Sequence, residues 1–235
     1  DPNEVWILEM IGKGPKNKGA VWVAQRIPDD CVSAHANQAR ITTFPLNDKN
    51  NCLYSKDVIT FAREKGYFKG KNNEFSFSDT YAPLDYTALR ACEARVWSFF
   101  RKVDPAMDKY ISYIKGETAQ RMPLWIKPTF KLSAQNIKDY MRDQYEGTEL
   151  DITKGIAAGP FNSKLRCSPL TWKVDGVEYV HERPTATQQT GFTFVSQLRS
   201  WLPNYIGGIL WFGVDDANSA LYVPIYCGTT AVPDR

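Results

Sequence analysis

Segments with the composition of β-strands stand at both ends of the chain, on either side of a section with the periodicity of helices. Residues 4–10 and 20–26 are rich in β-branched and aromatic side chains, and a connection rich in glycine and lysine separates them. With a third candidate strand at 31–37, they predict a three-stranded meander at the start of the chain. Strands followed by helices and then by strands indicate an α+β fold.

The helix signals lie in the middle section, about residues 55–147. The clearest helix is predicted at 87–102, where apolar residues recur at steps of three and four: Leu89, Cys92, Val96, Phe99 and Phe100. Ser133 has the short hydroxyl side chain that suits the N-cap of a helix. Further helices are predicted at 57–65, 105–115 and 134–145.

The last third of the chain returns to strand patterns. Asp175-Gly176 separates two short apolar runs, and this dipeptide is a strong local signal for a tight hairpin turn. Side chains at 192–199 alternate between apolar and polar, as in a half-buried strand. A second hairpin is predicted from two apolar segments, 208–214 and 220–226.

Composition excludes several classes of protein. Hydrophobic residues make up 43% of the 235 residues, which supplies a core for one domain or two small ones and excludes disorder. A net charge of +3 is too small to indicate a nucleic-acid partner or an acidic membrane surface. No segment has the run of about 18 apolar residues that a membrane span requires.

Few residues offer catalytic or metal-binding chemistry. The chain has two histidines, His35 and His181, and five cysteines without C-x-x-C spacing, so we predict neither a metal site nor a cofactor. The cysteines are interpreted as reduced, mostly structural thiols. The nucleophile elbow, the Walker loop, the dinucleotide fingerprint and the H-E-x-x-H zinc motif are all absent from the sequence.

One segment, residues 33–41, combines polar side chains of several kinds with small alanines that leave room for a ligand. The amide of Asn37 is a neutral donor suited to an oxyanion, and Arg40 can hold a carboxylate by two parallel hydrogen bonds. His35 lies in the same segment. Capping of a strand end explains the same residues without any catalytic role.

Several ordered segments resemble one known family. They are Glu4-Val5-Trp6-Ile7-Leu8-Glu9, the run from Gly19 to Asp30, His35-Ala36-Asn37-Gln38-Ala39-Arg40-Ile41, Phe194-Val195-Ser196-Gln197-Leu198-Arg199, Gly207-Gly208-Ile209-Leu210-Trp211 and Tyr222-Val223-Pro224-Ile225-Tyr226. As an ordered set, they resemble the dipeptidase A and secernin family of N-terminal-nucleophile hydrolases. This resemblance implies an αββα sandwich and hydrolysis of dipeptides.

In that family the nucleophile is a cysteine that becomes the first residue after a leader is removed, and its free α-amino group acts as the base. This chain begins at Asp1 and resembles the middle and later part of the catalytic domain, so 1–235 is expected to be a partial domain. The nucleophile is expected upstream, and the chain alone is expected to be inactive. Cys31 lies inside the chain without a free amine. The resemblance gives Asn37 the oxyanion role and makes His35 and Arg40 weaker candidates for substrate contacts.

Two alternatives to a dipeptidase remain open at this stage. One is a related amide hydrolase acting on conjugated bile acids or penicillin-like amides, because the same nucleophile chemistry serves those substrates. The other is a non-enzymatic binding or structural relative. The expected partners are a dipeptide substrate and the missing N-terminal part of the same protein, which would cover an exposed sheet edge. The sequence leaves homo-oligomerisation and the cellular compartment open.

Overall fold

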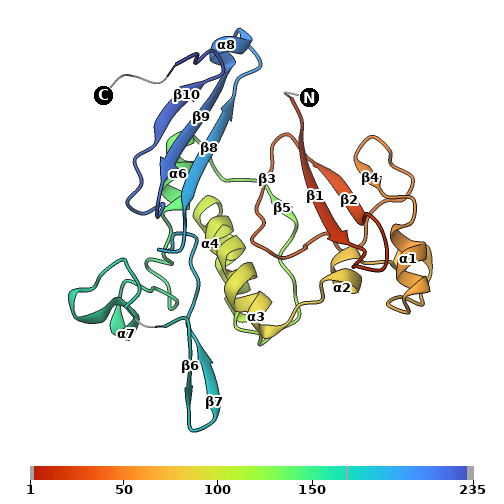
Figure 1. Cartoon of the computed structure of the whole chain (residues 1–235), viewed down its shortest axis with the longest axis horizontal. Coiled ribbons are helices and arrows are strands. Elements are labelled where there is room, and N and C mark those ends of the chain that lie inside the picture. The colour runs from red at the N-terminus through yellow and green to blue at the C-terminus, as the bar shows by residue number, and fades with distance from the viewer. Residues whose placement is uncertain (1–2, 168, 232–235) are drawn as a thin grey trace. The chain divides into compact units, whose positions relative to one another are not determined.

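The computed structural model in Figure 1 describes residues 3–167 and 169–231. Its mixture of helices and antiparallel sheets confirms the α+β class. The chain divides into two compact units, of which one is Glu4–Thr129 and the other consists mainly of the residues from Phe130 onward. The description of 1–235 as one partial domain stays a prediction.

The first unit combines a small sheet with most of the helices. Its strands are β1 (Val5–Gly12), β2 (Ala20–Ile27), β3 (Val32–Ser33), β4 (Cys52–Tyr54) and β5 (Trp125–Ile126). Its α-helices are α1 (Val58–Glu64), α2 (Phe77–Tyr81), α3 (Tyr86–Ala88), α4 (Ala94–Val103) and α5 (Ile111–Ile114). The other helical segments are the 3-10 turns η1 (Asn72–Glu74) and η3 (Pro105–Tyr110) and the π-helical turn η2 (Leu89–Glu93).

The sheet of this unit has the strand order β1-β2-β4, with both pairs antiparallel. The predicted meander is therefore wrong in its third strand. After β2 the chain turns at Pro28, and β3 pairs with β5 over two residues instead of returning along β2. The edge of β2 is occupied by β4, with Gln25 opposite Cys52.

The core of the first unit lies against one face of this sheet. Val21 and Val23 are completely buried there and pack with Phe75 and Phe77 from the region of α2. The opposite face carries Leu8, Met10 and Leu53, which are among the exposed large hydrophobic residues. One face of the sheet is thus packed, and the other presents apolar side chains.

The predicted helix at 87–102 is present, but it is not uniform. It begins at α3, passes through η2 and continues as α4 to Val103. A π-helical turn contains an extra residue relative to α-helix, and such turns are often found at functional sites. Here the turn ends at Glu93, which is buried although it is charged.

The second unit holds one three-stranded sheet and one separate hairpin. Its strands are β6 (Thr171–Val174), β7 (Val177–Val180), β8 (Phe192–Leu198), β9 (Gly208–Val214) and β10 (Val223–Tyr226). Its helical segments are α6 (Ala134–Met141), α7 (Gly155–Ala158), η4 (Gly159–Phe161) and α8 (Asn204–Gly207).

Two local predictions in this unit are confirmed. β6 and β7 form the predicted hairpin, with Asp175 and Gly176 at φ values of 50° and 80°. Positive φ at both central residues is the requirement of the tight turn that such a dipeptide favours. Ser133 caps α6, because its hydroxyl accepts the N–H of Asn136.

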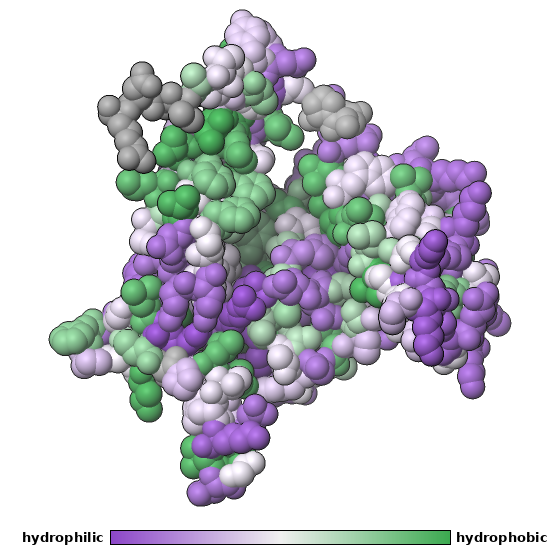
Figure 2. Space-filling view, viewed as in Figure 1, coloured by the Kyte–Doolittle hydropathy of each residue, from purple (hydrophilic) through white to green (hydrophobic). Residues whose placement is uncertain are grey.

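The sheet β10-β9-β8 has one covered face and one open face. The covered face includes Thr193, Val195 and Ile209, which are buried, and α6 packs against β8. The register places the exposed apolar side chains together on the other face: Phe192, Phe194, Leu198, Leu210, Val214, Val223 and Ile225. Figure 2 shows hydrophobic residues gathered over these strands.

Across the described residues, no helix is both long enough and apolar enough to cross a membrane.

Candidate active site

Asn37 lies in the loop that follows β3, and the loop presents it at the surface. Its backbone has φ 61°, in the left-handed region that few residues other than glycine adopt. Asparagine is one of the side chains that tolerate this conformation, and such strained positions are concentrated at functional sites. The structure therefore holds the predicted oxyanion residue in an exposed and unusual conformation.

Arg95 of α4 orients the side chain of Asn37. Its Nη2 donates to Asn37 Oδ1 at 2.8 Å and to the carbonyl of Ala36 at 3.4 Å, while its Nε donates to the carbonyl of Ala91 at 2.7 Å. A guanidinium group can only donate, so the Asn37 atom that faces it must be the amide oxygen. The Asn37 amide nitrogen is then the atom that can donate to a bound molecule.

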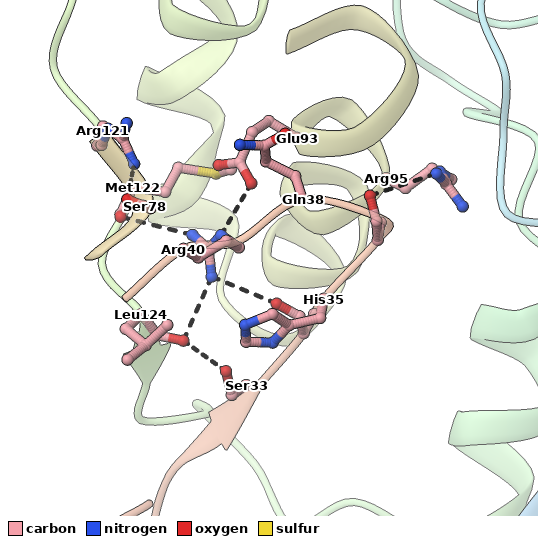
Figure 3. Close-up of polar contacts among 12 residues, drawn as sticks. Ser33, His35, Gln38, Arg40, Ser78, Glu93, Arg95, Arg121, Met122 and Leu124 are labelled. Atoms are coloured by element: carbon pink, nitrogen blue, oxygen red, sulfur yellow. Dashed lines mark hydrogen bonds and ion pairs between the residues drawn. The ribbon is translucent and has the colours of Figure 1, made fainter. Parts of the chain in front are cut away.

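Arg40 is buried and makes its hydrogen bonds within the protein. Its Nε donates to Glu93 Oε1 at 2.9 Å, and Figure 3 shows the guanidinium between Glu93 and the carbonyl of Leu124. The remaining N–H groups point to main-chain carbonyls, those of Ala34, Leu124, Met122 and Pro123, at 3.0–3.5 Å. The side chains of Arg40 and Glu93 are each 3% exposed. The substrate contact expected of Arg40 stays a prediction.

Glu93 is the point where this polar network meets the helix. Its Oε1 accepts from Arg40, and its Oε2 accepts the hydroxyl of Tyr113 at 3.2 Å. Burial, followed by the negative charge of Glu93, raises the pKa of Tyr113 above its usual range. Tyr113 therefore stays protonated and can donate to the carboxylate.

His35 contacts a carboxylate from the sheet. Its Nε2 lies 2.7 Å from Oε1 of Glu9, which is a residue of β1. The His35 side chain is 29% exposed, so the ring is partly accessible to solvent. A substrate contact by His35 stays a prediction. His35 and Asn37 lie in the same loop after β3.

A pocket of about 780 Å³ lies beside this network. Leu84, Leu89, Tyr113 and Arg121 are among the residues that line it, and Asn37 is not. The neighbouring segment is tied to the Asn37 loop, because Gln38 Nε2 donates to the carbonyl of Ala82 at 2.5 Å.

Two cysteine thiols, Cys31 and Cys52, have a raised pKa, which makes them poor nucleophiles. Burial, and then the hydrogen bond and charge of Asp30, raise the pKa of Cys31. Burial, with a contribution from Asp48, raises the pKa of Cys52 to about 11. A reactive cysteine needs a lowered pKa, because the thiolate is the attacking form. Among the described residues, no group of three or more His, Cys, Asp or Glu is arranged to hold a metal ion.

Sequence reasoning missed four residues of this network: Arg95, Glu93, Tyr113 and Glu9. Arg95 and Glu93 lie on a helix whose apolar periodicity drew attention to other positions. Glu9 offered a usable signal, because it interrupts the apolar face of a strand between Ile7 and Ile11. A charged residue at such a position is buried only when hydrogen bonds compensate for its lost hydration.

The chain is thus an α+β protein in which Arg95 orients the exposed carboxamide of Asn37. Residues 1–235 match the model of Peptidase family C69. The chain belongs to this peptidase family, which confirms the resemblance to dipeptidase A.

Proteins named as dipeptidases are similar to almost all of the chain. A probable dipeptidase of Salmonella dublin is 27% identical over 228 residues, which cover 97% of this chain and 46% of that protein. Dipeptidase A of Lactobacillus helveticus is 27% identical over 241 residues, covering 100% of this chain and 43% of that protein. A probable dipeptidase B of Streptococcus pyogenes serotype M1 is 24% identical over 225 residues, which cover 95% of this chain and 40% of that protein. The chain spans less than half the length of these relatives.

Proposed function

We propose that the protein containing this chain is a cysteine-type dipeptidase, in which Asn37 stabilises the oxyanion and the nucleophile lies upstream of the chain. The observation that carries the proposal is the orientation of the Asn37 amide. Arg95 occupies its oxygen at 2.8 Å, and its nitrogen is left to donate toward solvent. Membership of a peptidase family and similarity to proteins named dipeptidase support the same reaction.

The proposed reaction is acyl transfer in two halves. The cysteine thiolate attacks the carbonyl carbon of the dipeptide, a C–S bond forms, and the carbonyl oxygen takes the negative charge. Asn37 donates to that oxygen. The carbonyl re-forms as the C–N bond breaks, and the leaving amine takes the proton that the base removed from the thiol. Water then hydrolyses the thioester and releases the acid. The family resemblance makes the free α-amino group of the nucleophile the base.

Arg40 and Glu93 act in this proposal beneath the site. The five N–H groups of the Arg40 side chain connect the 35–41 loop to Ala34, to Glu93 and to the segment before β5. A buried network whose polar groups are all satisfied stiffens its surroundings. A stiff support suits a donor that must meet a developing charge without reorganising.

The finer fold assignment, an αββα sandwich, is also a proposal. Support comes from the two three-stranded sheets, each of which has one packed face and one face of exposed apolar side chains. A sandwich buries one face of each sheet between two layers of helices. β1 is moreover an edge strand with Val5, Leu8 and Met10 exposed. We propose that another part of the same protein covers these surfaces.

The test is the turnover of Asn37 variants in the full-length protein, measured on dipeptides and on acyl amides in parallel. Loss of one oxyanion donor is worth about 10²–10³ in kcat, so we expect Asn37→Ala to lose that factor while KM stays near that of the parent. Asn37→Gly removes the same amide and tolerates the positive φ, so it separates lost chemistry from backbone strain. An Asn37→Gly variant with undiminished kcat contradicts the oxyanion role. Turnover of acyl amides without turnover of dipeptides contradicts the substrate class.

A further inference from the structure

Glu9 carries a carboxylate into the core face of β1. The register places it opposite Val23, which is fully buried, and the Glu9 side chain itself is 5% exposed. Ile7 and Ile11 flank it on the same face of the strand. An ionised carboxylate at such a position is costly unless strong hydrogen bonds replace the lost water.

The hydrogen bonds that compensate Glu9 all come from the segment that contains Asn37. Oε1 accepts the backbone N–H of Arg40 at 2.6 Å and that of Ile41 at 2.9 Å. Oε2 lies 3.0 Å from the N–H of Ile41, and His35 Nε2 lies 2.7 Å from Oε1. The N–H groups of Arg40 and Ile41 are main-chain donors that lie outside the strands and take no part in strand pairing.

These contacts close a short loop over the sheet. His35 is bound to Glu9 on one side of Asn37, and Arg40 and Ile41 are bound to it on the other. Asn37 stands between them at φ 61°. A residue keeps such a conformation only where its surroundings fix it from more than one direction. Arg95 fixes the Asn37 side chain, and Glu9 fixes the two ends of its loop.

We infer that Glu9 is a positioning residue for the oxyanion donor: it anchors both ends of the 35–41 loop and so sets where the Asn37 amide points. The inference rests on the proposed oxyanion role of Asn37. Glu9 itself does not touch the substrate. It acts through the backbone, because its oxygens take the place of a strand partner for Arg40 and Ile41.

The experiment compares Glu9→Gln with the parent in the full-length protein. Gln keeps the size of the side chain, but it loses the negative charge, and its NH₂ group in the place of Oε2 meets the Ile41 N–H with a donor instead of an acceptor. A displacement of about 1 Å can cost about 10²-fold in rate, so we expect kcat to fall about 10-fold or more while KM stays within about threefold. Glu9→Asp keeps the charge and shortens its reach, and it should lower kcat in the same way. Glu4→Gln, which removes a carboxylate just outside β1, is the control and should leave kcat unchanged.

Amide hydrogen exchange provides a readout that does not depend on activity. In Glu9→Gln we expect exchange to become at least about 10-fold faster at Arg40 and Ile41, while β2 keeps its protection. Unchanged exchange at both amides, or equal loss of protection in β2, overturns the inference, since Glu9 would then hold nothing or would hold the sheet. Normal kcat in Glu9→Gln beside an inactive Asn37→Gly overturns the positioning role alone. Normal kcat in Asn37→Gly overturns the proposed function together with the inference.

Discussion

The buried pair of Arg40 and Glu93 makes a prediction that stability measurements can test without any assay of activity. Each side chain is 3% exposed, and the guanidinium–carboxylate distance is 2.9 Å. Removing one partner of such a pair leaves a buried charge without compensation and costs about 3–5 kcal/mol. Glu93→Gln keeps an acceptor for the Arg40 Nε, so we expect the free energy of unfolding to fall by about 3 kcal/mol, the lower end of this range.

The reverse substitution should cost more. Within the described part of the chain, Arg40→Met leaves Glu93 with one hydrogen bond, from the hydroxyl of Tyr113 at 3.2 Å, and it also deprives main-chain carbonyls of their donors. Each buried acceptor without a partner adds about 1–3 kcal/mol. The double variant, Arg40→Met with Glu93→Leu, leaves no unpaired charge. We therefore expect it to be less destabilised than the sum of its single variants by at least about 2 kcal/mol.

The assay is amide hydrogen exchange of β2 peptides across a urea series, which reports the free energy of unfolding of the first unit. Asp108→Asn is the matched control, because the Arg101–Asp108 pair lies in the same unit with side chains 22% and 52% exposed. Exposed pairs contribute less than about 1 kcal/mol. Single variants at Arg40 and Glu93 that cost no more than this control, or a double variant equal to their sum, would refute the reasoning.

Two further predictions concern reactivity and local folding. Burial raises the pKa of Cys52 to about 11, so little of its thiol is in the reactive thiolate form at pH 8. We therefore expect iodoacetamide to label the exposed Cys167 and Cys227 at least about 100-fold faster than Cys52, measured by mass spectrometry of the digested chain. Equal labelling of the three cysteines contradicts the burial of Cys52. Gly176 has φ 80° with open space around it, so Gly176→Ala should destabilise the β6–β7 hairpin through backbone strain alone, by about 1–2 kcal/mol. Loss of the cross-strand nuclear Overhauser contacts between Trp172 and Tyr179 measures that change, and a hairpin as stable as the parent contradicts it.

Local chemistry explains which structural predictions succeeded. The Asp175-Gly176 turn and the Ser133 cap depend on the conformational preferences of one or two residues, and both are present. The prediction of the third strand of the meander was wrong because strand pairing there depends on residues distant in the sequence. Val32 and Ser33 pair instead with Ile126 and Trp125, far along the chain, and β4 takes the edge of β2. A strand-like composition could not reveal either partner.

Only some residues of the candidate site could be predicted from the sequence. Asn37 was found by its residue type and its setting, and its exposure agrees with a role toward solvent. Arg95 lies 58 positions further along the chain, and only the fold brings its guanidinium to the Asn37 oxygen. Glu93 is the last residue of a π-helical turn, and the regular three-and-four spacing of 87–102 gave no sign of that turn.

The bare face of the β8–β10 sheet has a practical consequence for anyone who produces this chain by itself. Seven apolar side chains on one side of this sheet, among them Phe192 and Leu198, form an exposed hydrophobic surface. An exposed apolar surface of this kind favours association between copies of the chain at high concentration. A mild detergent is therefore a sensible starting point for purification.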